Sequence, residues 1–192
     1  MTKSILLVGV GGQGTILAAK ILSLGLVSGG YDVKMSEIHG MSQRGGSVSS
    51  HVRYGDKVFS PVIEKGGTDI LVAFEQMETL RWLEYLRPDA KAVVNSRTIK
   101  PAPVLLGKAE YSPRILQEIR SRADTTVLDA ETEATAVGNA RTANILLIGA
   151  AVRIMGLADI DWAGIIAENV RKSFVEVNRK AFLRGMALVG GN

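Results

Sequence analysis

A glycine-rich turn near the N-terminus constrains the fold of this chain more than any other feature. Residues 4–8 are a short apolar stretch, residues 9–14 carry the pattern Gly-x-Gly-x-x-Gly, and residues 14–27 have the composition of a helix. A second apolar stretch, predicted to be a strand, follows at residues 31–36. This order is typical of a βαβ unit, in which the two strands run parallel with a right-handed crossover. The sequence therefore predicts an α/β fold.

The same turn is a candidate binding site for an anionic ligand. Glycines let backbone N–H groups approach a phosphate closely, and the N-terminus of the following helix adds a favourable dipole. Thr15 stands where a Walker A loop requires lysine, so the turn is not of that type. A purely structural turn is the alternative. The candidate contacts are Gly9, Gly11, Gly12, Gln13 and Gly14.

A second glycine-rich run follows the second predicted strand and reads Glu-Ile-His-Gly-Met-Ser-Gln-Arg-Gly-Gly-Ser over residues 37–47. Residues 37–46 show no regular period, so we expect a loop at the carboxyl edge of the sheet. There it would face the first glycine turn across the crevice in which open α/β sheets bind ligands. The candidate site residues of this run are Glu37, His39, Gln43, Arg44, Gly45 and Gly46.

The charged and titratable residues of this run allow more than one role. Glu37 lies where a dinucleotide-binding fold places the acid that binds a ribose hydroxyl. Arg44 beside two glycines can form a charge-assisted anion site, and an ion pair with Glu37 or Glu75 is the alternative. His39 titrates near neutral pH and is a candidate acid or base; the alternative is a hydrogen-bonded anchor of the loop.

The remaining sequence predicts a mixed sheet. Polar and apolar residues alternate over residues 47–54, which indicates a strand with one polar face that includes His51. A turn signal at Gly55 and Asp56 predicts that residues 57–62 return as the second arm of a hairpin. Further strands are predicted at residues 69–74, 90–95 and 125–128, and helices at residues 75–86, 113–122, 142–155, 161–173 and at the C-terminus.

We therefore expect a three-layer α/β/α Rossmann-like domain, with a parallel core, a hairpin and a helical C-terminal part. Residues 1–192 are expected to form a single domain on which the helices from about residue 141 pack. The helices at residues 14–27 and 142–155 are apolar nearly all round, so each must be buried on more than one side. Either neighbouring helices of the same domain or another subunit can cover them.

Two more candidate site residues follow predicted strands. Glu75 and Asn95 come directly after apolar stretches, so both should lie along the same edge of the sheet as the glycine turn. Helix capping by Glu75 and turn formation at Asn95 are the alternatives.

The composition excludes several kinds of chemistry. No cysteine is present, which excludes thiolate catalysis and cysteine ligation of an iron–sulfur cluster by this chain. The net charge of +4 is a mild basic excess, and the densest basic stretch, residues 171–184, has Glu168 beside it and Glu176 within it, so a nucleic-acid partner is not expected. No signal-peptide pattern is found, and the longest apolar run, residues 145–152, is far below the ~20 residues of a membrane span. We expect a cytoplasmic protein without a membrane partner.

The sequence resembles the gamma-type subunits of the 2-oxoacid:ferredoxin oxidoreductases, especially those of the indolepyruvate branch. The order and spacing of the matching segments hold to about Pro101, and the match is looser beyond. The His-Gly-Met-Ser-Gln-Arg-Gly-Gly block at residues 39–46 is the specific element. The matching segments are residues 9–14, 36–47, 51–53, 60–63 and 69–75, then 138–139 and 144–149.

The resemblance implies an enzyme that oxidatively decarboxylates a 2-oxoacid, of the indolepyruvate, arylpyruvate or pyruvate type, to acyl-CoA, CO2 and reduced ferredoxin. It implies that this chain is a non-redox accessory subunit that contributes CoA binding, assembly or both, through residues 9–14 and 43–46. No catalytic residue and no turnover are then expected of the chain alone.

The resemblance also implies where the cofactors lie. Thiamine diphosphate, Mg and iron–sulfur clusters are expected on an alpha-type partner subunit, because this chain has no cysteine and no Gly-Asp-Gly with a downstream Asn-Asn. Ferredoxin is then an indirect partner, and a homodimer is allowed for the isolated chain. Two other functions stay open: a stand-alone NAD- or FAD-binding Rossmann protein, and a module that senses CoA or a nucleotide.

Overall fold

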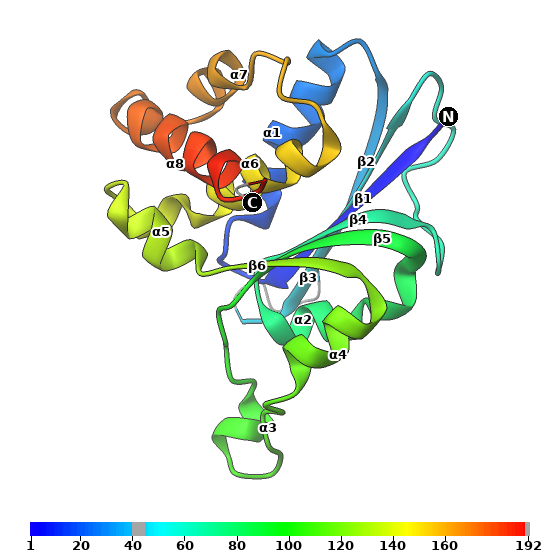
Figure 1. Cartoon of the computed structure of the whole chain (residues 1–192), viewed down its shortest axis with the longest axis vertical. Coiled ribbons are helices and arrows are strands. Elements are labelled where there is room, and N and C mark those ends of the chain that lie inside the picture. The colour runs from blue at the N-terminus through cyan, green and yellow to red at the C-terminus, as the bar shows by residue number, and fades with distance from the viewer. Residues whose placement is uncertain (40–44, 191–192) are drawn as a thin grey trace.

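The computed structural model describes residues 1–39 and 45–190, and its centre is a six-stranded sheet in the order β2-β3-β1-β4-β5-β6 (Figure 1). Four neighbouring strands run parallel: β1 (Lys3–Val10), β4 (Thr68–Ala73), β5 (Leu86–Asn95) and β6 (Asp124–Leu128). β3 (Ser47–Gly55) pairs antiparallel with β1 and with β2 (Asp32–His39). The predicted three-layer α/β fold with a mixed sheet is confirmed.

Helices cover both faces of the sheet, which is why its central strands are apolar on both sides. In β1, Ile5 and Leu7 belong to one core cluster and Leu6 and Val8 to the other, and all four are fully buried. The first cluster lies under α1 (Thr15–Ser28), α5 (Ala130–Ala136), α6 (Ala143–Met155), α7 (Trp162–Asn169) and α8 (Val175–Ala187). The second lies under α2 (Gln76–Arg81) and α4 (Ile115–Arg122), while α3 (Ala102–Leu105) projects away from the sheet (Figure 1).

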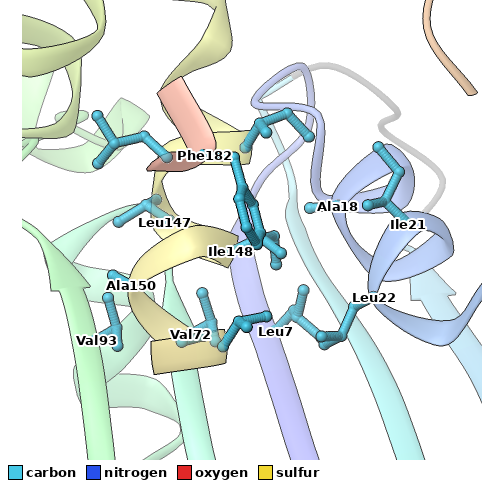
Figure 2. Packing of buried hydrophobic residues seen from close by; sticks show 14 of the residues in the cluster. Leu7, Ala18, Ile21, Leu22, Val72, Val93, Leu147, Ile148, Ala150 and Phe182 are labelled. Carbon is cyan, nitrogen blue, oxygen red and sulfur yellow. The ribbon is translucent and has the colours of Figure 1, made fainter. Parts of the chain in front are cut away.

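The apolar helix α6 is covered within this chain. Its Leu147, Ile148 and Ala150 lie among side chains of the sheet, of α1 and of α8 (Figure 2). Neighbouring helices therefore explain the apolar surface of α6. In α1, by contrast, Ile16 and Val27 are 52% and 55% exposed, so a subunit interface stays a prediction for that helix.

Two expectations about β2 and β3 were wrong. The first concerns the hairpin, which was expected to join residues 47–54 to residues 57–62. In the structure β3 lies between β1 and β2 and pairs antiparallel with both, so the antiparallel pair of consecutive strands is β2 and β3. Residues 37–39 belong to β2 instead of a loop: Glu37 pairs with Ser50 and His39 with Val48. An edge strand that is half exposed on both faces leaves no clear period in the sequence, which explains the error.

Residues 57–62 do not form the second arm of a hairpin. Both backbone edges of β3 are already paired, so this segment instead crosses the polar face of β3 and bonds to its side chains. Nδ1 of His51 accepts from the N–H of Ile63 at 3.1 Å. The guanidinium of Arg53 donates to the carbonyls of Ser60 and Val62 at 3.1 and 3.2 Å. The polar face that the sequence predicted therefore anchors a connecting segment.

Several helix boundaries also differ from expectation. The helix predicted at residues 75–86 ends at Arg81 and is followed by the 3-10 helix η1 (Leu83–Tyr85). Pro88 lies inside β5, where the pairing with β4 is irregular and no ladder N–H is required. α4 begins at Ile115, two residues after Pro113, and α7 ends at Asn169, before η3 (Lys172–Phe174). Asp161 caps α7 as predicted, accepting from the N–H of Gly164 at 2.9 Å.

His51 makes the stability of the fold depend on pH. The side chain is 3% exposed, and burial lowers the pKa of its imidazole below the ordinary value of 6.5. Its Nε2 has no hydrogen-bond partner among the described residues, and the ring lies edge-on to Trp82 and Tyr85. The folded chain therefore holds neutral His51, whereas the unfolded chain takes up a proton as the pH falls through 6.5.

We predict that the stability contributed by neutral His51 is complete above pH 6.5 and is lost as the pH falls towards the lower folded pKa. The slope cannot exceed ~1.4 kcal/mol per pH unit, the value for one full proton. Urea titrations between about pH 7.5 and 5.5 measure it. Gln in place of His51 keeps an acceptor and should flatten the dependence; an unchanged slope in His51→Gln would contradict the prediction.

Candidate functional site

A crevice of about 490 Å3 lies at the carboxyl ends of the parallel strands. The glycine turn follows β1, Phe74 follows β4, Asn95 ends β5, and Glu131 lies in α5 after β6. The chain leaves β1 towards β2 on one side and builds β4, β5 and β6 on the other, so this is a topological switch point. The glycine-turn crevice is lined by Gly12, Gln13, Gly14, Phe74, Asn95, Arg97, Glu131, Ala140, Arg141, Ala143, Asn144 and Leu147.

Gln13 holds the turn in place across the switch point. Its Oε1 accepts from the N–H of Val10 at 2.8 Å, and its Nε2 donates to the carbonyl of Phe74 at 2.7 Å. The backbone of Gly9 passes so close that an added Cβ would lie 2.9 Å from the Gln13 amide oxygen and 3.0 Å from Phe74. The Gln13 side chain thus ties β1 to β4.

Gly14 joins α1 to α6. It has φ of 78°, in the left-handed region, and its carbonyl accepts from Nδ2 of Asn144 at 3.2 Å. A Cβ on Gly14 would lie 2.6 Å from that same Nδ2. The N-termini of α1 and α6 therefore meet at this hydrogen bond, and their dipoles favour an anion in the crevice.

Gly45 and Gly46 lie beside the first turn. The N–H of Gly11 donates to the carbonyl of Gly46 at 2.8 Å, and the N–H of Gly45 donates to the carbonyl of Gly11 at 3.3 Å. The expected proximity of the two glycine segments thus holds for these residues. Gln43 and Arg44 lie outside the described residues, as does the side chain of His39, so their predicted roles stay predictions.

Glu37 is separated from the glycine turn by a whole strand. It lies in β2, while β3 runs between β2 and β1. Neighbouring strands are spaced about 4.8 Å apart, so β2 lies roughly 10 Å from β1 in the plane of the sheet. A ribose clamp of the dinucleotide-binding type needs the acid on the strand next to β1, and here β3 and β4 occupy those positions.

Asn95 organises a polar group at the far end of the crevice. It is 1% exposed; Nδ2 donates to the carbonyl of Phe74 at 3.2 Å and to Glu131 at 2.9 Å, and Oδ1 accepts from the N–H of Ala130 at 3.1 Å. Glu131 also accepts from Arg97 at 2.7 Å. These bonds hold β4, β5 and α5 together and leave the Arg97 guanidinium, 48% exposed, at the crevice.

Glu75 is buried beside this edge and does not line the crevice. Its carboxylate accepts from the N–H of Glu78 at 3.0 Å, from the N–H of Ile99 at 3.0 Å and from the Tyr111 hydroxyl at 2.6 Å. The helix cap considered from the sequence is present, and the same side chain also fixes the connection after β5. Burial, then the bond to Glu75, raise the pKa of the Tyr111 phenol, so Tyr111 remains a donor.

Glu78 places a second buried carboxylate near the glycine segments. It is 5% exposed, accepts from the hydroxyl of Ser47 and pairs with Arg81 at 3.2 Å. Burial raises the pKa of Glu78, although the Ser47 hydrogen bond and the Arg81 charge oppose that change. Glu78 therefore links α2 to β3 just after Gly46, which supports the backbone that faces the first turn.

Sequence reasoning missed four polar residues that line the crevice: Arg97, Glu131, Arg141 and Asn144. Asn144 is the only one with a visible signal, because it is a polar residue at the start of a helix whose only other polar residue is Arg153. Within the described residues, no His, Cys, Asp and Glu side chains gather in a group suited to a metal ion. None of the described helices combines the length and apolar composition that crossing a bilayer requires.

The comparisons with known proteins decide the family. The sequence pattern of the family described as pyruvate ferredoxin/flavodoxin oxidoreductase matches residues 4–188. The chain belongs to this family. The resemblance indicated by the two glycine segments is thereby confirmed, and it extends well beyond Pro101 into the C-terminal helices.

Two relatives of the family show how far the likeness reaches. The indolepyruvate oxidoreductase subunit IorB of Pyrococcus horikoshii is 37% identical over 191 residues, which cover 95% of this chain and 94% of that protein. The crystal structure of the gamma subunit of a keto/oxoacid ferredoxin oxidoreductase from Geobacter sulfurreducens covers 97% of both chains, with a TM-score of 0.72 and 26% identity.

A larger enzyme contains the same fold. The 2-oxoglutarate:ferredoxin oxidoreductase of Magnetococcus marinus, solved with 2-oxoglutarate, coenzyme A and succinyl-CoA bound, matches with a TM-score of 0.79 at 16% identity. The match covers 100% of this chain and 31% of that one. At this identity the likeness concerns the fold alone.

Proposed function

We propose that this chain is the small, non-redox subunit of a thiamine diphosphate-dependent 2-oxoacid:ferredoxin oxidoreductase of the indolepyruvate type. The observation that carries the proposal is the family match over residues 4–188, together with relatives of nearly equal length that are named indolepyruvate oxidoreductase subunits. The assembled enzyme would convert a 2-oxoacid and CoA to acyl-CoA and CO2 and pass two electrons to ferredoxin.

The donor set of this chain supports an accessory role. Iron–sulfur clusters are held by cysteine thiolates, and this chain has none. Its buried carboxylates, Glu75 and Glu78, are held by backbone N–H groups, a tyrosine, a serine and an arginine of the same chain. These residues do not fit thiamine diphosphate or a cluster, so a cysteine-rich alpha-type partner would hold both.

We further propose that the glycine-turn crevice contributes to CoA binding in the assembled enzyme. CoA carries phosphates, and the crevice offers the N-termini of α1 and α6 and the guanidinium of Arg141. The backbone N–H groups of Gly12 and Gly14 have no backbone acceptor among the described residues. Gln43 and Arg44, predicted from sequence, would add to this site from the neighbouring glycine segment.

The crevice does not favour the stand-alone NAD- or FAD-binding alternative. That function requires an acid on the strand beside β1, and Glu37 lies two strands away. Calorimetric titration of the isolated chain with NAD(H) and FAD tests this alternative directly, since micromolar binding of either would revive it.

The test of the proposed function reconstitutes the chain with its cysteine-rich partner. We predict that neither chain alone reduces ferredoxin at the expense of indolepyruvate and CoA, and that the mixture does. Within the complex, Gly12→Ala should raise KM for CoA at least tenfold with little change in kcat, because a methyl group on the crevice floor blocks close approach of a phosphate.

Gly30→Ala is a matched control for Gly12→Ala. Gly12 and Gly30 have φ of 103° and 86°, and a Cβ on either meets nothing within 4 Å. Both substitutions should therefore cost a similar ~1–2 kcal/mol of stability, yet Gly30 follows the far end of α1 and should leave KM for CoA unchanged. Equal KM values for CoA in the two variants would show that the crevice does not bind CoA. Full activity of the partner alone would show that this chain has no accessory role.

A further inference from the structure

A second cavity adjoins the glycine-turn crevice, and the proposed function uses only one residue of its lining for ligand binding, Arg141, which the two cavities share. Its volume is about 500 Å3, within the range of ~300–1,000 Å3 that small-molecule sites occupy. Arg141 and Asn144 line both cavities, but this one is also walled by η2 (Ala140–Thr142), the end of α7, η3 and the start of α8. We name it the Arg171 pocket, after the arginine that lines this cavity and not the glycine-turn crevice.

The Arg171 pocket is electropositive. Two arginines, Arg141 and Arg171, line it, and no aspartate or glutamate does. Neither guanidinium has a carboxylate within ion-pair distance among the described residues, whereas Arg184 on the same helical layer is paired with Glu133 at 2.7 Å. Two unneutralised arginines at a concave site favour an anion, and a phosphate monoester suits their fork of donors.

Asparagine amides add hydrogen-bonding capacity inside the pocket, and two of them, Asn144 and Asn178, are buried. Asn139, Asn144, Asn169 and Asn178 all line it. Asn178 is only 7% exposed; its Nδ2 donates to the carbonyl of Phe174 at 2.8 Å, and its Oδ1 accepts no hydrogen bond from the described residues. This oxygen is not one of the buried polar atoms that lack a partner, so it is accessible from the cavity and can accept from a ligand N–H or O–H.

An aromatic ring gives the pocket an apolar wall. Phe174 lines the pocket and is 42% exposed. Phe74 and Phe182, by contrast, are buried in the core. Leu17 and Val170 continue the apolar surface. A planar heterocycle can stack on such a ring while the amides bond its edge and the arginines bind its phosphate.

We propose that the Arg171 pocket binds a nucleotide-like small molecule, in which a phosphate monoester is joined to a planar, hydrogen-bonding base. This chemistry has two sources, a free nucleotide or the phosphorylated nucleoside end of a larger cofactor. The pocket is distinct from the floor of the glycine-turn crevice, so the proposal does not depend on CoA use there.

Calorimetric titration of the full chain with AMP tests the proposal, with adenosine and inorganic phosphate as partial ligands. We expect AMP to bind, and both partial ligands to bind at least tenfold more weakly. Arg171→Gln should weaken AMP binding at least tenfold. Asn178→Asp, which has nearly the same shape but brings a negative charge, should weaken it further.

Arg120→Gln and Gly12→Ala are the controls. Arg120 is an exposed arginine of α4 on the opposite face of the sheet, and Gly12 lines only the glycine-turn crevice, so AMP affinity should be unchanged in both. The Gly12→Ala result also separates this proposal from CoA binding in the crevice. Displacement of AMP by CoA would identify a cofactor as the source, and no displacement would identify a free nucleotide.

Three results would overturn the proposal. AMP that does not bind would show that the pocket has no affinity for this class. Wild-type AMP affinity in Arg171→Gln would place the ligand elsewhere. Adenosine or inorganic phosphate that binds as tightly as AMP would show that the phosphate or the base makes no contribution.

Discussion

Replacing Gly185 with alanine is expected to lower the free energy of unfolding by roughly 3 kcal/mol or more, because α6 and α8 touch backbone to backbone. A Cβ on Gly185 would lie 1.9 Å from the carbonyl oxygen of Leu146, and a Cβ on Gly149 would lie 2.1 Å from that of Phe182. The atoms that would have to move belong to two buried helices, so the clash cannot be relieved by a side-chain rotation. Gly149→Ala should have a comparable effect.

Urea denaturation followed by circular dichroism measures this change. Alanine is intrinsically better than glycine in a helix by about 1 kcal/mol, so any loss of stability reflects the clash and not the helix propensity. Leu183→Ala is the control in the same helix. It alters more atoms than Gly185→Ala does, but the Leu183 side chain is 63% exposed, so the free energy of unfolding should change by no more than ~0.5 kcal/mol. A Gly185→Ala variant as stable as the wild type would show that α6 and α8 are further apart than described.

The contact between Gly149 and Gly185 could not be predicted from the sequence, although the helices that contain them could. The apolar run at residues 142–155 predicts a buried helix, and α6 confirms it. The run cannot show which helix covers α6, since Gly149 and Gly185 lie far apart in the chain and each alone lowers helix propensity. Only the crossing of α6 and α8 explains why both positions lack a side chain.

The sheet was likewise predicted in part: its local elements follow from the sequence, but the order of its strands does not. The strands β1 and β4 follow from continuous apolar runs, which are typical of strands covered on both faces. The place of β3 between β1 and β2 was not predicted, because the turn signal at Gly55 and Asp56 is local and the pairing of β3 is not. The polar face of β3 was predicted, but its role was not: His51 and Arg53 bond the segment that follows the strand.

For the candidate site, the sequence located the edge of the sheet but not all its residues. Gly12, Gln13, Gly14 and Asn95 line one crevice, as expected of the ends of parallel strands, whereas Gly9 and Gly11 of the same turn do not line it. Arg141 and Asn144 were missed because they come from the far end of the chain: the bond from Asn144 to Gly14 spans 130 residues. No local pattern records such a contact.

Replacing Glu75 with leucine is the second substitution expected to have a large effect, a loss of roughly 3 kcal/mol or more in the free energy of unfolding. Leucine has a similar size but no acceptor, so the N–H groups of Glu78 and Ile99 and the hydroxyl of Tyr111 would all lose their partner. A buried donor left without an acceptor costs about 1–3 kcal/mol, and of these three donors the Glu78 N–H is buried and the other two are partly buried. Urea denaturation of the isolated chain measures the sum.

Two further variants separate a structural role of Glu75 from a ligand-binding one. Glu75→Gln keeps one acceptor oxygen, so it should lose only about 1 kcal/mol. Tyr111→Phe should lower the stability of the wild-type chain but should change little in the Glu75→Leu background, because the bond between the two side chains is already gone. If Glu75→Leu instead kept wild-type stability while the reconstituted complex lost its use of CoA, the carboxylate would act on a ligand, as the sequence first suggested. Glu75 is 1% exposed and its oxygens are held by three donors of its own chain, and this is why we expect stability to change and not affinity.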